Sequence, residues 1–432
     1  MPGPLDSFSC SATSDWYPSG LDHIWLPYAQ MKTAPAPLPV VRTQGTRIHL
    51  ADGRELVDGI ASWWTACHGY NHPHIREAVQ RQLAVMPHVM FGGLVHEQPL
   101  TLARRLCEIL PGDLTRVFFT DSGSVAVEVA MKMAIQYWLN RGATKRDTFV
   151  CFRGGYHGDT LGTMAISDET GMHQAFAGVL HRHLIAELPR DDDSESALVT
   201  LLERHAGRLA GIVVEPLVQG AGGMRFHDPD VLKRLRRLAD RFDLLLIFDE
   251  IFTGFGRTGT MFACEGAGVV PDIVTLSKAL TGGTLPLAAT VARGKIFDAF
   301  WSDDPMHALM HGPTYMANAL ACAAANASLD LFAGGERLRQ VARIEQWLAA
   351  GLAPCRDLPG VTDVRMRGAI GVVELDRIDD LNALRRAFVE KGAFIRPIGN
   401  AIYLAPAFTI AEEDVAALTR VIGEVVRELA AR

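Results

Sequence analysis

The sequence of 432 residues lacks several features that mark specialised classes of protein. No apolar run reaches the ~20 residues that a membrane-spanning helix requires. The N-terminus has no basic stretch followed by an apolar stretch, so no signal peptide is expected. The net charge is only −7 and no basic cluster occurs, which argues against nucleic acid or an anionic membrane surface as a partner.

Cysteine is scarce and is not arranged for disulfides or metals. The seven cysteines are scattered, odd in number and without a C-x-x-C pair: Cys10, Cys67, Cys107, Cys151, Cys264, Cys322 and Cys355. Reduced thiols in a cytoplasmic protein are therefore expected. The histidine pairs His72/His74 and His181/His183 lack further ligands at a suitable spacing, so the sequence indicates no metal site.

Internal repeats and low-complexity tracts are also absent. The composition, 48% apolar and 21% charged, is that of a folded globular protein. At this length, two domains or one large domain with an appendage are expected. The most polar run, residues 190–197, is interpreted as a surface loop that leads into a helix at about 196–209.

The central part of the chain alternates apolar runs with helical segments, which favours an α/β fold with a parallel or mostly parallel sheet. Strands are expected at 116–120, 148–154, 210–217, 244–250, 272–278 and 285–293. Helices are expected at 72–86, 96–110, 124–142 and 228–242, the last with Asp228 as N-cap and Pro229 in its first turn. We predict a large α/β domain of residues 66–330 and a smaller α+β domain built from both chain ends, 1–65 and 331–432.

Three features lie where such a fold binds ligands, at the carboxyl ends of the strands. Gly123 and Ser124 begin a helix after the first of these strands, and its free N–H groups suit a phosphate; an ordinary capped turn is the alternative. Asp249 ends an apolar strand, where it serves either a ligand or a structural salt bridge or cap. Lys278 ends another strand, and is either exposed to solvent or a buried amine nucleophile of lowered pKa.

Together these residues suggest one cofactor, pyridoxal 5'-phosphate. It needs a phosphate site, a lysine for its Schiff base and an acid opposite its pyridine nitrogen. Tyr156, in the glycine-rich stretch "RGGYHGDTLG" (153–162), adds an aromatic ring suited to stacking on a flat cofactor. A packed loop aromatic is the alternative for this tyrosine.

Two stretches then carry a family resemblance, "DEIFTGFGRTG" (249–259) and "PDIVTLSKALTGG" (271–283). They resemble the signature of the class III (ω-type) pyridoxal-phosphate aminotransferases, and the resemblance runs from about residue 22 to the end of the chain. It implies the fold-type I architecture of pyridoxal-phosphate-dependent transferases. It also implies a homodimer whose active sites are shared between the subunits.

Further stretches narrow the resemblance within this family: 62–73, 89–97, 120–138, 153–160, 213–227, 309–329 and 394–406. They are similar to the members that transfer the α-amino group of S-adenosylmethionine to 8-amino-7-oxononanoate. The product of that reaction is 7,8-diaminononanoate, in biotin biosynthesis. The resemblance therefore implies a ping-pong reaction in which the cofactor alternates between its pyridoxal and pyridoxamine forms.

The resemblance also implies roles for the cofactor-binding residues. Lys278 would form the Schiff base and, once freed, would move the proton during transfer. Asp249 would keep the pyridine nitrogen protonated, and Tyr156 would stack on the ring as part of the catalytic group. Gly123 and Ser124 would bind the phosphate. The partner subunit would supply the "HGPT" residues that line the site, Gly312, Pro313 and Thr314, the last of these on the phosphate.

Substrate contacts follow from the same resemblance. Arg396 would bind the carboxylate of the keto substrate, because its planar fork matches two oxygens. Trp63 and Trp64 would be apolar walls of the substrate pocket. Trp63 would contact the substrate directly, and Trp64 would lie either in the pocket or in the core. Two further side chains match positions of substrate recognition, and a third is a weaker pocket candidate: Tyr28, Asp159 and Tyr403.

The chain departs from the family pattern at a few positions, none of them catalytic: Leu26, Phe252, Tyr315 and Ala407-Phe408. Leu26 and Phe408 lie near the predicted substrate pocket, so the identity of the amino donor stays open. Another class III ω-aminotransferase that uses lysine, a diamine or another amine is the main alternative. An aminomutase or a decarboxylase of the same fold is favoured less, because of the tryptophan pair and Arg396. A non-catalytic protein would not need Lys278.

Overall fold

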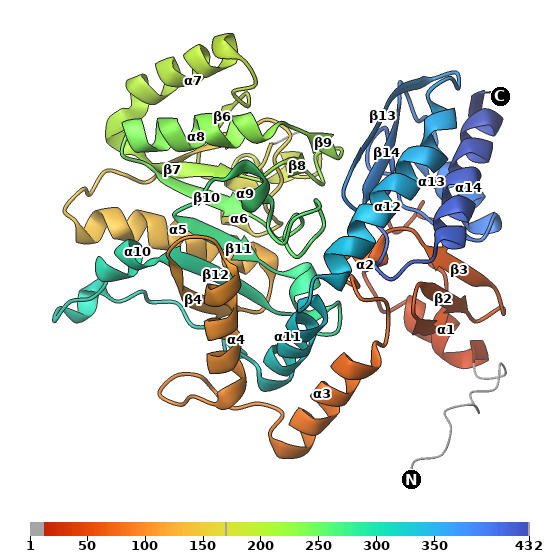
Figure 1. The fold of residues 1–432 in the computed structure, drawn as a ribbon, viewed down its shortest axis with the longest axis horizontal. Helices are drawn as coiled ribbons and strands as arrows, with labels where there is room; N and C mark the ends of the chain where they lie inside the picture. The colour runs from red at the N-terminus through yellow and green to blue at the C-terminus, as the bar shows by residue number, and fades with distance from the viewer. Residues whose placement is uncertain (1–12, 169–170, 431–432) are drawn as a thin grey trace.

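The computed structural model describes residues 13–168 and 171–430, so Cys10 and the rest of the first twelve residues lie outside the described part. Its largest sheet has the strand order β4-β12-β11-β10-β7-β5-β6 (Figure 1). The strands are β4 (Leu114–Thr120), β5 (Thr148–Phe152), β6 (Leu184–Ala186), β7 (Leu209–Val214), β10 (Leu245–Asp249), β11 (Ile273–Leu276) and β12 (Ala288–Arg293). Within the described sheet, β12 runs against its neighbours β11 and β4, and the other pairs are parallel. The prediction of a mostly parallel α/β sheet is confirmed.

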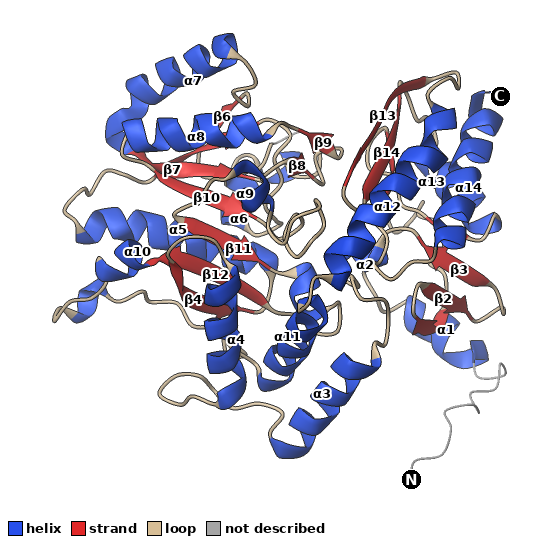
Figure 2. Cartoon of the chain, viewed as in Figure 1, coloured by secondary structure: helices blue, strands red, loops and turns tan. Residues whose placement is uncertain are grey.

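Alternate residues of the central strands enter two different cores. On β10, Leu245 and Ile247 share a core with α5 (Gly123–Asn140), whereas Leu246 and Phe248 share the other core with α8 (Pro229–Arg241). Figure 2 shows the helices, in blue, on either side of the red strands. Burial on both faces is the reason that these strands are continuous apolar runs rather than alternating ones.

Other helices and short strands belong to this part of the chain. They are α3 (Pro73–Val85), α4 (Glu97–Ile109), α6 (Leu161–Ala165), α7 (Asp192–His205), α9 (Ala263–Ala267), α10 (Gly294–Asp298), α11 (Ala319–Phe332), β8 (Val218–Gln219), β9 (Arg225–Phe226) and the 3₁₀ helix η4 (Lys278–Thr281). No helix in the described residues combines the length and the apolar character needed to span a bilayer.

Both chain ends contribute to a second region, at the right of Figure 1. One sheet joins β1 (Val40–Gln44), β2 (Arg47–Leu50) and β3 (Glu55–Asp58) to β15 (Ala393–Phe394), and β15 pairs in parallel with β3. An antiparallel sheet contains β13 (Val361–Arg367), β14 (Ile370–Leu375) and β16 (Ala401–Leu404). The helices here are α1 (Thr13–Leu21), α2 (Ala61–Trp64), α12 (Glu336–Leu352), α13 (Leu381–Glu390) and α14 (Glu412–Ala430). The residues at which the two domains divide stay a prediction.

One helix start differs from the sequence-based expectation, and another agrees with it. The polar run 190–197 is not a loop before the helix, because α7 already begins at Asp192. The carboxylate of Asp191 accepts from the backbone N–H of Ser194 at 2.8 Å, and the Ser194 hydroxyl accepts from the N–H of Asp191 at 3.1 Å. This reciprocal capping box makes the polar residues the first turn of the helix. Asp228 does occupy the N-cap of α8, but its side chain makes no capping hydrogen bond.

Candidate active site

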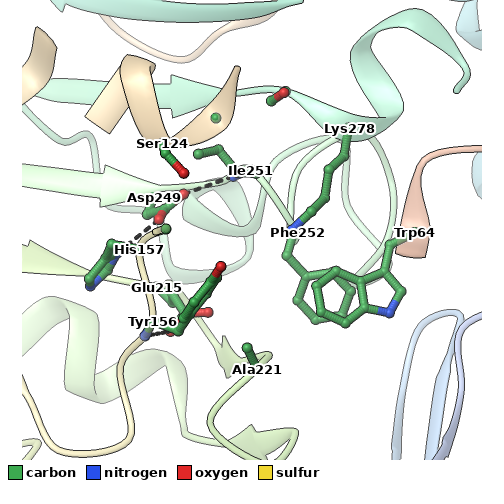
Figure 3. A pocket seen from close by; sticks show the side chains of 13 residues that line it. Trp64, Ser124, Tyr156, His157, Glu215, Ala221, Asp249, Ile251, Phe252 and Lys278 are labelled. Carbon is green, nitrogen blue, oxygen red and sulfur yellow. Dashed lines mark hydrogen bonds and ion pairs between the residues drawn. The ribbon is translucent and has the colours of Figure 1, made fainter. Parts of the chain in front are cut away.

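A cavity of about 160 Å³ lies at the carboxyl ends of the parallel strands (Figure 3). Its lining comes from segments far apart in the sequence: Trp64, Gly123, Ser124, Tyr156, His157, Gly158, Glu215, Ala221, Asp249, Ile251, Phe252, Ser277 and Lys278. The ends of β4, β5, β7, β10 and β11 converge here because parallel strands deliver their carboxyl ends to one edge of the sheet. The structure thus brings together the residues that the sequence placed at three separate strand ends.

Asp249, the last residue of β10, is buried and surrounded by hydrogen-bond donors. Its carboxylate lies 2.8 Å from Nδ1 of His157, and it accepts from the backbone N–H of Ile251 at 3.1 Å and from the hydroxyl of Thr275 at 3.2 Å. Burial lowers the pKa of His157, but the hydrogen bond and charge of Asp249 outweigh it and raise that pKa overall. The hydrogen bond to Asp249 therefore favours the protonated form of the imidazole and fixes the direction of the carboxylate.

Lys278 lies just beyond its strand, since β11 ends at Leu276 and the lysine opens η4. The prediction that the strand continues through residue 278 is wrong. The side chain is partly buried, with Nζ 4.3 Å from the ring centroid of Trp64 and 5.9 Å from that of Phe252. Burial lowers the pKa of the amine to about 8, although the charges of Asp249 and Glu215 act in the opposite direction. The buried-nucleophile alternative for this lysine is therefore favoured over the solvent-exposed one.

The turn that carries Lys278 is held by a chain of buried hydrogen bonds. Lys278 itself has φ = 46°, a left-handed conformation that is uncommon outside glycine. The backbone carbonyl of Ala279 accepts from the hydroxyl of Ser328 at 3.3 Å. The hydroxyl oxygen of Ser328 in turn lies 3.0 Å from Nε2 of His68. Nδ1 of His68 accepts from Nε of Arg337 at 3.0 Å, so the ring must be the tautomer that carries its proton on Nε2.

The first turn of α5 offers an anion site on the other side of the cavity. The N–H groups of Gly123 and Ser124 have no carbonyl four residues back within the helix, and the helix dipole adds positive charge there. A β-carbon on Gly158 would lie 2.1 Å from the Ser124 hydroxyl, so only glycine lets this loop approach the helix. The hydroxyl of Ser122 caps the helix through the N–H of Val125 at 3.3 Å, so the cap and the anion site coexist.

Glu215, at the end of β7, completes the cavity wall beneath Tyr156. Its carboxylate accepts from the backbone N–H of Tyr156 at 3.0 Å and from that of Gly220 at 2.9 Å. Burial raises the pKa of Glu215 to about 7, against the lowering effect of nearby His157. The sequence analysis missed both Glu215 and His157. Glu215 had the same signal as Asp249, a carboxylate directly after an apolar strand, and His157 is adjacent to Tyr156.

Tyr156 belongs to a polar group at the mouth of the cavity. Its hydroxyl lies 3.4 Å from that of Tyr28, which in turn hydrogen-bonds the carboxylate of Asp159. The Tyr156 ring is stacked near His173, with centroids 6.0 Å apart and planes at 25°. Tyr28 and Asp159, predicted for substrate recognition, therefore lie together beside the predicted stacking residue.

Trp63 and Trp64 face different surroundings although they are adjacent in sequence. Trp64 is 6% exposed and packs against Phe252, at a centroid distance of 4.2 Å. Trp63 is 40% exposed and lies beside Tyr28, at 6.0 Å, and beneath the guanidinium of Arg396, at 5.6 Å. One tryptophan therefore belongs to the lysine cavity, and the other to the neighbouring region that holds Arg396.

Arg396 and Tyr28 line a second cavity, of about 770 Å³, between the segment 26–40 and α13. Burial lowers the pKa of Arg396, and among the described residues no carboxylate forms an ion pair with it. A partly buried guanidinium without a counter-ion suits a carboxylate ligand. Tyr403 lines neither this cavity nor the lysine cavity; it is fully buried, with its ring centroid 6.1 Å from that of Trp64. It supports the tryptophan rather than a ligand.

The three "HGPT" residues are not brought to the lysine cavity by this chain. Gly312 and Thr314 are exposed and Pro313 is partly buried, in the loop before α11. Their predicted role needs a second subunit. Among the described residues, no group of three or more His, Cys, Asp and Glu side chains is placed to hold a metal.

The cavity fits pyridoxal phosphate on its own geometry. The N-terminus of α5 and the Ser124 hydroxyl would hold the phosphate, and Asp249 lies where an anion can face a pyridine nitrogen. Lys278 projects an amine into the same space, and Tyr156 presents its ring at the mouth. Each requirement of the cofactor is met by a different strand end.

Comparisons with known proteins agree with this geometry. The family described as aminotransferase class-III matches residues 28–426. A protein of Mycobacterium leprae is 47% identical over 413 residues, which cover 93% of this chain and 94% of that protein. A protein of Buchnera aphidicola subsp. Acyrthosiphon pisum is 44% identical over 408 residues, which cover 93% of this chain and 95% of that protein. Both are named adenosylmethionine-8-amino-7-oxononanoate aminotransferase.

Solved structures show the same fold. A structure named for that same activity, from Methanocaldococcus jannaschii, superposes with a TM-score of 0.90 at 32% identity and covers 96% of this chain and 98% of its own. An amine transaminase from an uncultivated Pseudomonas species, in its pyridoxal-phosphate-bound form, has a TM-score of 0.87 at 31% identity, covering 94% and 98%.

Proposed function

This chain belongs to the class III aminotransferases, which depend on pyridoxal phosphate, and from that premise we propose that it transfers the α-amino group of S-adenosylmethionine to 8-amino-7-oxononanoate. The product is 7,8-diaminononanoate, a precursor of biotin. The observation that carries the proposal is the convergence of Lys278, Asp249 and the α5 N-terminus on one cavity, in a chain 44–47% identical to proteins of that name.

The cofactor, when bound, supplies an electron sink that stabilises negative charge on the substrate carbon. Asp249, supported by His157, would favour a protonated pyridine nitrogen, because a buried carboxylate favours a cation beside it. Gly123 and Ser124 would hold the phosphate through backbone N–H groups and one hydroxyl. Tyr156 would offer its ring to the flat face of the cofactor.

Lys278 would hold the cofactor through its amine, and the same amine would move the proton at the substrate carbon. A pKa of about 8 leaves an appreciable neutral fraction of the amine near neutral pH, which a general base requires. The aromatic rings of Trp64 and Phe252 lie beside it, and their apolar surroundings favour the neutral amine.

The two cavities suit the two ends of the keto substrate. The reacting carbonyl lies near Lys278, and the carboxylate at the far end of the aliphatic chain binds Arg396. The ring of Trp63, in contact with Arg396, covers the apolar chain between them. The same aromatic faces attract the sulfonium of S-adenosylmethionine, so one site accepts two unlike substrates in turn.

We also propose a homodimer in which Gly312, Pro313 and Thr314 complete the site of the other subunit. Supporting this, large apolar side chains near that loop are unusually exposed in the single chain: Trp301 (79%), Met306 (79%) and Met310 (84%). A surface of this kind marks an interaction site. The free cysteines at the six described positions are in keeping with a reducing compartment, and we place the protein in the cytoplasm.

A single spectroscopic experiment tests the proposed donor. S-adenosylmethionine alone, added to the yellow holoenzyme, is expected to convert the cofactor to its pyridoxamine form and to bleach the visible band. Lysine and a diamine, at the same concentration, serve as rival donors. Bleaching by lysine or the diamine, with no change on adding S-adenosylmethionine, would replace the proposed donor and leave the aminotransferase chemistry intact.

A further inference from the structure

Four consecutive residues between the two cavities have a left-handed backbone. The φ angles of Ala61, Ser62, Trp63 and Trp64 are 46°, 51°, 53° and 72°, and none of the four is glycine. The N–H groups of Trp64 and Thr65 close the turn onto carbonyls four residues earlier, at 2.8 and 2.9 Å. L-residues avoid this region because the β-carbon crowds the next carbonyl, so a run of four persists only where surrounding contacts hold it.

Asp58 supplies those contacts from the end of β3. Its side chain is buried, 2% exposed, and both carboxylate oxygens face the turn. Oδ1 accepts from the N–H of Ile60 at 2.9 Å, and Oδ2 accepts from the N–H of Ser62 at 2.9 Å. The hydroxyl of Tyr70 donates to Oδ2 at 2.5 Å, and so fixes the carboxylate in this orientation.

The hand of the turn decides where the two tryptophans lie. In a left-handed turn, successive side chains rotate in the opposite sense to those of an ordinary helix, so the sequence order alone does not place them. Here Trp64 is directed to the amine of Lys278 and Trp63 to the guanidinium of Arg396. A right-handed turn would point the two rings in other directions, and the contacts with Lys278 and Arg396 would be lost.

We propose that Asp58 and Tyr70 are positioning residues for substrate recognition: they hold a strained left-handed turn that presents Trp63 to the substrate carboxylate end and Trp64 to the reacting end. The inference rests on the proposed function for its choice of substrate. Neither residue lines the lysine cavity or the Arg396 cavity, so both act through the tryptophans.

The first test compares Asp58→Asn with Asp272→Asn. Asp272 is a control buried away from the turn: it accepts from the backbone N–H of Leu246 at 2.9 Å, and its charged partners are Arg236, Lys295 and Arg293. Asp58→Asn is expected to raise the KM for 8-amino-7-oxononanoate about tenfold and to change kcat less, because misplaced walls weaken binding along the chain. It is also expected to change the near-ultraviolet circular dichroism of the tryptophans. Tyr70→Phe should have the same effects in weaker form.

The second test uses glycine and needs no substrate. Ser62→Gly removes the β-carbon at an exposed left-handed position and is expected to raise the thermal midpoint, whereas Ser196→Gly, at an exposed position inside α7, should lower it. Ser62→Gly should also restore part of the circular dichroism of Asp58→Asn.

These readouts separate the inference from the proposed function. If S-adenosylmethionine proves not to be the donor, the thermal midpoints and the dichroism still test the turn. The inference is overturned if Ser62→Gly lowers the midpoint as Ser196→Gly does, or if folded Asp58→Asn and Tyr70→Phe match Asp272→Asn in dichroism and in the KM for the keto acid.

Discussion

The Nδ1 atom of His157 lies 2.8 Å from the carboxylate of Asp249, and both side chains are buried. His157 lies in the loop after β5 and Asp249 ends β10, so the two groups meet only when the sheet forms. A carboxylate that is hydrogen-bonded to an imidazole, a backbone N–H and a hydroxyl has its orientation fixed before any ligand arrives. We propose that the imidazole is thus the support for the acid that faces the cofactor.

His157→Phe is expected to lower kcat roughly tenfold or more, because it removes one charge-assisted hydrogen bond from a buried acid. His157→Asn, whose amide can still donate to Asp249, should retain more activity. The check is the pH dependence of the visible absorption band together with kcat. Equal losses in the two variants would show that the ring only fills space.

Lys278→Ala is expected to abolish the covalent bond to pyridoxal phosphate, while the phosphate site at α5 remains. Borohydride reduction followed by peptide mass spectrometry checks this, because wild type should carry the cofactor on the peptide containing residue 278. Lys295→Ala, at a half-exposed position on α10, is the control and should label as wild type does. Fixation of the cofactor on another lysine of Lys278→Ala would contradict the assignment.

The cofactor-free protein should become more stable, relative to Lys278→Met, as the pH rises from about 8 to about 10.5. In this window the folded amine is already neutral and the unfolded amine is still protonated, so the unfolded state binds more protons. The difference in unfolding free energy should grow with pH by up to about 3 kcal/mol. Denaturant unfolding of both proteins at several pH values measures it, and a pH-independent difference would argue against a buried, neutralised lysine.

Arg396→Ala is expected to raise the KM for 8-amino-7-oxononanoate at least tenfold, because a charge-assisted bond to the carboxylate is worth roughly 1.5–3 kcal/mol. The affinity for the amino donor should fall much less. Arg386→Ala is the matched control, since Arg386 lines the same cavity but is exposed on α13 and away from Trp63. A similar loss for both substrates would remove the carboxylate role of Arg396.

Phe252→Ala should widen the lysine cavity and allow bulkier amines to act as donors. The ring lies between Trp64 and Gly220, where a β-carbon on Gly220 would come within 2.7 Å of it. The substitution should cost about 3 kcal/mol of stability through the space it leaves. Gly220→Ala should be harmful in wild type and tolerated in Phe252→Ala; additive effects of the two changes would show that the ring does not rest on Gly220.

Some of the missed features had a signal in the sequence, and others had none. Glu215 follows an apolar strand as Asp249 does, so the same argument applied to β7 finds it. The chain of hydrogen bonds that holds the Lys278 turn has no such signal in the sequence, because His68, Ser328 and Arg337 belong to three separate segments. The handedness of Ala61–Trp64 has none either, since no glycine marks it.

The amino-acid order by itself determined the order of the chemistry-bearing residues along the strands, the cofactor and the family, because apolar runs followed by Asp249 and Lys278 specify both a sheet and the chemistry at its edge. The tertiary structure decided how the side chains around those ends are arranged. Burial lowers the pKa of Lys278, and the fold brings His157 to Asp249. Asp58 holds the residues Ala61–Trp64 in a left-handed turn that L-residues ordinarily avoid. These effects depend on how close residues remote in sequence come to one another and on how far their side chains are removed from water. Only the folded chain sets these distances and this burial.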